Sequence, residues 1–175
     1  RDAAGRRTRY NGPIPLRSPI PLMHISDKRS PWQDEFNIPT LDDLRIDLPL
    51  PSAELFDTTR SFLLSNENIL EEMRWYGDCW FWTISYYLKS ENTDDDLPIA
   101  VIIPAPDNLQ VAAPLDREFL EQLNTRRMKR AVRDGIDLAA EPYSTQWAVW
   151  PVNAKNLLED LISLLKQRLS WLQGT

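Results

Sequence analysis

The sequence predicts an α+β domain, in which an antiparallel sheet of four to five strands has helices packed on one face. Two patterns in the body of the chain indicate this class. Large apolar side chains alternate along residues 80–88, as in a strand with one apolar face. Leucines recur at helical spacing over residues 154–172, as in a long amphipathic helix. A third pattern, the closely spaced prolines near the beginning, predicts an extended arm over residues 1–37.

Composition is typical of one globular domain, expected at residues 38–175, plus the arm. The chain has 175 residues, of which 42% are hydrophobic and 26% charged. Its longest apolar runs are far shorter than the roughly 20 residues that span a bilayer, so we expect no membrane partner. The single cysteine, Cys79, excludes an internal disulfide and fits a reducing compartment. We therefore expect a cytoplasmic protein.

Charge is divided unevenly along the chain. The first 30 residues carry seven basic and two acidic side chains, whereas the remainder carries 13 basic and 24 acidic ones. A basic arm on an acidic body predicts docking of the arm, either on its own body or on a second copy as a homodimer. Another protein is the alternative partner. The acidic body argues against nucleic acid.

Local patterns predict the remaining elements in order. Thr40 and Asp43 have the spacing of a capping box, which begins a short helix. Ser52 is an N-cap candidate for a helix from Ala53. Apolar residues then recur at helical spacing in residues 69–75, which predicts a second helical piece.

Strands are expected at residues 80–88, 97–104, 109–113 and 146–152, with a polar turn at 91–96. Short helices are expected at 116–123 and 126–134, the second one ended by Gly135, followed by extended backbone to residue 142. We expect the helices from Ala53 and Ala154 to cover the sheet face that carries Trp80, Trp82 and Tyr86.

Aromatic side chains are the richest functional signal. Most of them are expected in the core, because large rings bury much apolar surface. Two or three can instead line a ligand groove between sheet and helix. The candidates for this groove are Trp75, Tyr76, Trp80, Tyr87, Trp147 and Trp150.

Charged side chains suggest two further sites. Glu71, Glu72 and Asp78 can place carboxylates at a cleft mouth and are the candidates for metal binding, although a solvated helix end is the simpler explanation for them. Residues 94–96 are three aspartates without the spacing of a calcium loop, so a solvated turn is expected there. The anion-binding candidates, on one expected helix face, are Arg126, Arg130 and Arg133. Pairing with neighbouring carboxylates is the alternative for them.

Catalytic motifs are missing from the sequence. It has no glycine-rich phosphate loop, and its only histidine, His24, is far from Cys79 along the chain. We therefore expect a non-enzymatic binding or interaction module without a cofactor. The alternative is a carboxylate-based iron-handling protein or a small hydrolase using Glu71, Glu72 and Asp78.

Residues 71–77, which run into the tryptophan-rich strand, resemble those of uncharacterised bacterial domains of the YdhG-like type. The arginine-rich stretch 126–135, followed by a strand and a leucine-rich terminal helix, is similar to the same family. The resemblance covers roughly residues 38–172. It implies an α+β domain with helices on one face of an antiparallel sheet, and some relatives are suspected of intracellular iron handling.

Overall fold

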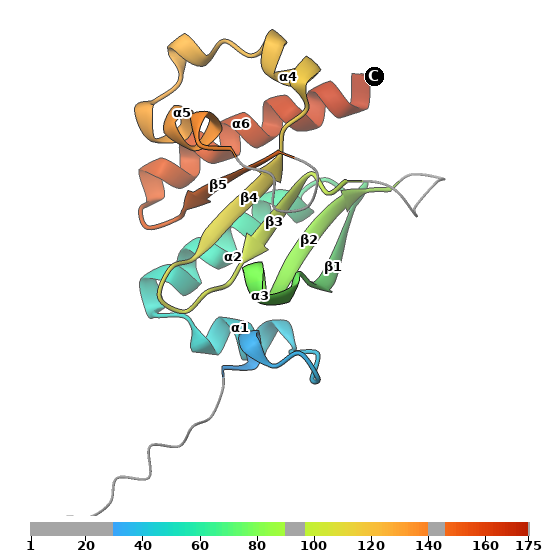
Figure 1. Cartoon of the computed structure of the whole chain (residues 1–175), viewed down its shortest axis with the longest axis vertical. Helices are drawn as coiled ribbons and strands as arrows, with labels where there is room; N and C mark the ends of the chain where they lie inside the picture. Colours follow the sequence, from blue (N-terminus) through green and yellow to red (C-terminus); the bar gives the residue numbers. More distant parts are fainter. Residues whose placement is uncertain (1–29, 90–96, 140–145, 175) are drawn as a thin grey trace, which may run out of the picture.

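A computed structural model describes residues 30–89, 97–139 and 146–174, which contain one five-stranded antiparallel sheet (Figure 1). The strands are β1 (Ile69–Trp75), β2 (Trp82–Leu88), β3 (Ala100–Ile103), β4 (Gln110–Pro114) and β5 (Trp147–Pro151). Each strand pairs with its successor in the sequence, so the sheet is a meander. The predicted α+β class is confirmed.

Helical elements lie before, within and after the sheet. In chain order they are η1 (Pro31–Gln33), α1 (Leu41–Asp47), α2 (Leu50–Leu64), α3 (Gly77–Trp80), α4 (Arg117–Gln122), η2 (Thr125–Arg127), α5 (Arg130–Asp137) and α6 (Lys155–Gly174). The helices α2 and α6 lie behind the sheet in Figure 1 and pack against each other.

The main core lies between the sheet and the α2–α6 layer. Ile84 and Tyr86 of β2 point into it, because strand side chains two apart share a face. Phe56 of α2 and Leu161 of α6 meet them, and all four are at most 2% exposed. Each buried side chain of this size contributes roughly 1.5–3 kcal/mol to folding.

The first two helices begin as local chemistry dictates. The predicted capping box is confirmed: Thr40 Oγ1 accepts from the Asp43 backbone N–H, and the Asp43 carboxylate accepts from the Thr40 N–H. In contrast, α2 begins at Leu50 rather than after Ser52, since proline is tolerated in a first helical turn and Pro51 lies inside it.

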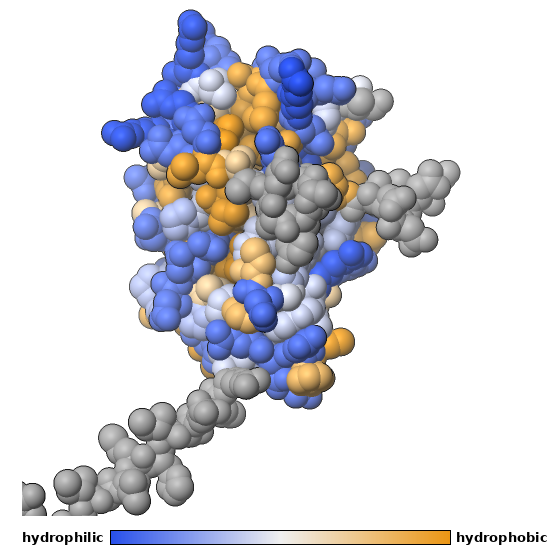
Figure 2. All heavy atoms as spheres, in the orientation of Figure 1, coloured by the Kyte–Doolittle hydropathy of each residue, from blue (hydrophilic) through white to orange (hydrophobic). Residues whose placement is uncertain are grey.

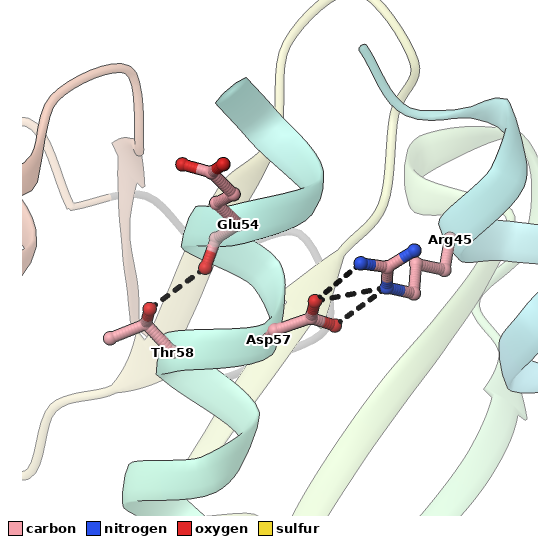
Figure 3. Close-up of polar contacts among 4 residues, drawn as sticks. All are labelled: Arg45, Glu54, Asp57 and Thr58. Carbon is pink, nitrogen blue, oxygen red and sulfur yellow. Dashed lines mark hydrogen bonds and ion pairs between the residues drawn. The ribbon is translucent and has the colours of Figure 1, made fainter. Parts of the chain in front are cut away.

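A bidentate ion pair links α1 to α2 (Figure 3). Arg45 Nε and Nη2 donate to the Asp57 carboxylate at 2.7–2.9 Å, and along α2 the Thr58 hydroxyl donates to the Glu54 carbonyl at 2.8 Å. Both partners of the ion pair are more than 40% exposed. An exposed ion pair contributes little to the free energy of folding. We therefore expect it to set the orientation of α1 against α2 more than to stabilise the fold.

The segment 69–75 is a strand and not the expected helix. It pairs along its whole length with β2, with Trp75 opposite Trp82 and Met73 opposite Ile84. The helical spacing of its apolar residues was misleading, because Ile69, Met73 and Trp75 also lie an even number of positions apart, as on one face of a strand. Seven paired positions on β2 decide in favour of the strand.

Two more expectations about local structure are wrong. Trp80 belongs to α3 and packs with residues of the sheet face opposite α2 and α6, including Val101 and Trp147. Gly135 does not end a helix but lies inside α5, which continues to Asp137. This position requires glycine, because a Cβ there would lie 2.0 Å from Nε1 of Trp150.

The predicted arm divides at residue 30. Residues 30–37 include η1 and bond to the body, for example from Ser30 Oγ to the Asp47 carboxylate, so they are part of the folded domain. Three predicted features lie outside the described residues. They are the arm over residues 1–29, the turn at 91–96 and the end of the extended segment at 140–142.

Candidate functional site

The connection from β1 to β2 has unusual backbone geometry. Gly77 adopts φ 61°, which glycine tolerates, and Phe81 adopts φ 55° and ψ −138°, which a bulky residue rarely does. Such a backbone conformation costs about 1–3 kcal/mol of folding free energy and persists only where the surrounding structure holds it. Backbone bonds close the turn, since Phe81 N donates to Gly77 O at 2.8 Å and Tyr76 N to Phe81 O at 2.9 Å.

Residues 30–37 hold this strained turn from outside. The Trp32 ring meets Phe81 edge-on at 4.8 Å between centroids, and Trp32 Nε1 donates to Trp80 O at 3.1 Å. In return, Trp82 Nε1 donates to the carbonyl oxygen of Asp34 at 2.7 Å. Two indoles therefore fasten segments that are 48 residues apart in sequence.

A cleft of about 270 Å³ opens between these two segments. Trp75 and Phe81 contribute aromatic surface, and the 87% exposed ring of Phe36 lies at the same cleft. Glu35 and Asp78 contribute carboxylates. Neither carboxylate forms an ion pair with another residue in the part of the chain that the structure describes. We call this site the aromatic cleft.

The aromatic cleft is suited to a cation. Aromatic faces attract ammonium and guanidinium groups, and carboxylates accept charge-assisted hydrogen bonds from them. Sequence reasoning singled out Trp75 and Asp78 but missed Glu35, Phe36 and Phe81. No sequence signal marks the positive φ of Phe81, although its position inside the run Trp80-Phe81-Trp82 was visible.

An aromatic cluster packs behind the turn on the sheet face opposite α2 and α6. Tyr76, Trp80 and Trp147 meet with centroid distances of 5.1–6.3 Å. Trp80 and Trp147 are at most 7% exposed, so they support the turn more than they offer a surface. Nε1 of Trp147 is buried and has no hydrogen-bond partner in the described structure.

Trp150, another groove candidate, lies on the opposite sheet face from Trp147. Three positions separate them on β5, and an odd separation reverses the face. Trp150 is 1% exposed and its Nε1 donates to Val132 O at 2.9 Å, so it is a core residue. Trp147 and Trp150 therefore cannot line the same groove.

Tyr87 lies on the sheet face opposite α2 and α6, 8% exposed, with the Arg74 guanidinium 5.0 Å from its ring centroid. Burial, and secondarily the neighbouring Tyr76, raise the pKa of Tyr87 to about 12, against the opposing effects of Ser85 and Arg74. Folding therefore favours the protonated phenol.

This raised pKa predicts an alkaline loss of stability. The stabilisation from Tyr87 is complete below its unfolded pKa of about 10 and is lost as the pH rises through about 12. We expect the free energy of unfolding from urea titrations to fall over this range, and to fall less in Tyr87→Phe. Burial also raises the pKa of Tyr86, but this residue is present in both proteins, so its contribution cancels in the comparison. Equal slopes in the two proteins would contradict the assignment.

The three candidate carboxylates do not converge. Glu71 faces α2, where it accepts two bonds from Arg60 at 2.7 and 2.9 Å and one from the Tyr86 hydroxyl at 3.0 Å. Glu72 faces the other way and pairs with Arg74 at 3.1 Å, because neighbours on a strand alternate. Asp78 lies in α3, at the aromatic cleft.

Within the described ranges, no group of three or more histidine, cysteine, aspartate or glutamate side chains is placed to hold a metal ion. The described residues therefore give no specific support to the iron-handling or hydrolase alternative.

The arginine candidates occupy two elements and not one helix face. Arg126 lies in η2, whereas Arg130 and Arg133 lie in α5. Arg130 pairs with Asp134 at 3.4 Å, the arrangement that was the alternative to anion binding. Lys129, between the two elements, pairs with Asp160 of α6 at 3.0 Å.

The fold and the site define an α+β domain with an acidic, aromatic surface cleft at one end of its first hairpin. No family model, curated protein or solved structure matches the chain. The resemblance to YdhG-like domains therefore stays a prediction. In the part of the chain that the structure covers, no helix is both long and apolar enough to cross a membrane.

Proposed function

We propose that this domain is a non-enzymatic binding module, and that the aromatic cleft takes a cationic side chain from a basic protein segment. One observation carries the proposal. Two aromatic rings, Trp75 and Phe81, and two carboxylates, Glu35 and Asp78, converge on one cleft from segments about 40 residues apart. A held, strained residue in the wall, Phe81, is typical of a functional position.

The charge and size of the cleft favour this ligand class over others. Glu35 and Asp78 would repel an anion, and an apolar ligand would leave both carboxylates desolvated without partners. A volume of about 270 Å³ is small for a whole metabolite but accommodates the end of a lysine or arginine side chain.

The chain itself contains a basic segment of this kind. Residues 1–29 carry seven lysines and arginines against two acids, and they join the folded domain three residues before Gln33 of the cleft. We propose that this arm occupies the cleft, from its own chain or from a second copy. Prolines restrict the arm in advance, so docking loses little entropy. Exchange between two copies would give a symmetric dimer.

The test compares ¹H–¹⁵N NMR spectra of the full chain with those of the arm variant Arg6→Gln/Arg7→Gln/Arg9→Gln. We expect shifts at the Trp75, Asp78 and Phe81 amides. A peptide of residues 1–29 added to the arm variant should reverse them. Adding Asp78→Asn to the arm variant should weaken its affinity for the peptide about tenfold at low salt, because a charge-assisted hydrogen bond is lost. Glu118→Gln makes an equal charge change at an exposed position of α4 and should leave the affinity for the peptide unchanged.

Light scattering shows which copy supplies the arm. A dimer that becomes monomeric in the arm variant means exchange, and an unchanged monomer with the same NMR shifts means docking on the same chain. Spectra that do not differ at the cleft would contradict docking of the arm. If the peptide binds the arm variant equally well with and without Asp78→Asn, the cleft itself is not the site.

A further inference from the structure

We infer that a second cleft, between α6 and the segment formed by η2 and α5, binds a small amphiphilic anion, a carboxylate carried on an apolar chain. The cleft has a volume of about 450 Å³, within the range of roughly 300–1,000 Å³ that small-molecule sites occupy. Figure 2 shows hydrophobic surface between hydrophilic side chains at the end of the molecule that holds α4, α5 and α6. Figure 1 places this end away from α1 and α3, and so from the aromatic cleft.

Apolar side chains from both walls form the floor of this α5–α6 cleft. Val132 of α5 and Leu164 of α6 are each 2% exposed, and Met128 lies half-buried before α5. Val132 and Leu164 belong to the main core, so the floor is rigid. Methionine adapts its shape to irregular ligands. This floor is suited to a flexible alkyl chain.

Basic side chains line the same cleft. Arg127 of η2 is exposed and pairs with no other residue in the described ranges, and Lys129 follows two positions later. Arg126 and Arg133, also without ion pairs among the described residues, strengthen the positive potential of this segment. The residues after position 30 carry 13 basic and 24 acidic side chains, so such a concentration of positive charge is unusual for this body.

One acidic group opposes the anion. Asp160 of α6 lies 3.0 Å from the Lys129 ammonium and also lines the cleft. A bound carboxylate would compete with Asp160 for Lys129, whereas Arg127 is available without competition. The geometry therefore predicts opposite effects: loss of the Arg127 charge weakens binding, and loss of the Asp160 charge strengthens it.

The experiment titrates octanoate, octanol and acetate into the full-length protein and follows ¹H–¹⁵N NMR shifts of residues at the cleft. We expect octanoate to bind at least tenfold more tightly than octanol, which lacks the charge, or acetate, which lacks the chain. Arg127→Gln should weaken the affinity for octanoate about tenfold, as expected for the loss of one charge-assisted hydrogen bond. Asp160→Asn should tighten it roughly fivefold. Arg117→Gln, an exposed charge change on α4, should leave the affinity unchanged.

Each contrary result overturns the inference. Equal affinities for octanoate and octanol would show an apolar cleft without anion selectivity, and equal affinities for octanoate and acetate a purely electrostatic site. An Asp160→Asn variant that binds more weakly, with an otherwise native spectrum, would contradict the competition between Asp160 and the bound carboxylate for Lys129. Shifts confined to residues elsewhere would show that the cleft is not the site.

Discussion

Replacing Trp150 with alanine is expected to lower the free energy of unfolding by about 3–5 kcal/mol, measured by urea denaturation. The ring is 1% exposed in the main core, so its removal leaves a cavity under α5. Its Nε1 also donates to Val132 O at 2.9 Å, and alanine leaves that buried carbonyl without its partner. A loss below 1 kcal/mol would mean that the ring does not hold α5 on the sheet.

Gly135 provides a sharper test of the same contact. In the wild type, the Cβ of Gly135→Ala would lie 2.0 Å from Nε1 and 2.4 Å from Cδ1 of Trp150, and overpacking of this kind destabilises by about 1–3 kcal/mol. The higher helix propensity of alanine offsets only about 1 kcal/mol of this destabilisation. With Trp150→Ala the clash is gone, so Gly135→Ala should then stabilise. Additive effects of the two substitutions would contradict the contact. Gly174→Ala, with nothing within 4 Å, is the matched control.

The second large effect is expected from Asp116→Asn, at about 2–3 kcal/mol of lost stability. Arg168 of α6 is only 2% exposed, and its Nη1 lies 2.9 Å from the Asp116 carboxylate. Burial lowers the pKa of Arg168 and Asp116 raises it, yet arginine stays charged in either case. An unpaired buried charge destabilises by about 3–5 kcal/mol. We expect less here, because Asp116 is 35% exposed and water screens the pair.

Arg168→Met separates the charge from the packing. Methionine keeps much of the side-chain volume and removes the buried charge, whose Nε has no partner in the described structure. We therefore expect a stability within about 1 kcal/mol of the wild type by urea denaturation. Arg117→Gln, in the exposed pair with Glu121, serves as the control and should change stability by less than about 0.5 kcal/mol. If Arg168→Met destabilises as much as Asp116→Asn, packing and not charge governs this site.

Where local chemistry and tertiary contacts agree, the sequence was a reliable guide. The capping box of Thr40 and Asp43 needs only four residues and occurs as predicted. The leucine stripe of α6 predicts its buried face, since Leu158, Leu161 and Leu165 are at most 2% exposed. Both patterns are complete within one element, so no distant residue can reverse them.

Where two periods fit the same residues, the sequence was ambiguous. Ile69, Leu70 and Met73 fit a helix, whereas Ile69, Met73 and Trp75 fit one face of a strand, and only pairing with β2 decides between them. That choice also decides the chemistry. It places Glu71 against Arg60 and turns Glu72 to the opposite face, so a candidate carboxylate site is separated into two structural ion pairs.

The sequence by itself determined the class of the fold, the buried face of the long helices and the uneven charge, because these depend on composition and on periods within single elements. The tertiary structure alone decided where the two clefts lie. The aromatic cleft needs Glu35 and Phe81 to lie together although some 46 positions separate them, and the positive φ of Phe81 occurs in a turn against which Trp32 packs. No local pattern encodes such a meeting, since it depends on the summed packing energy of contacts that exist only after the chain has folded.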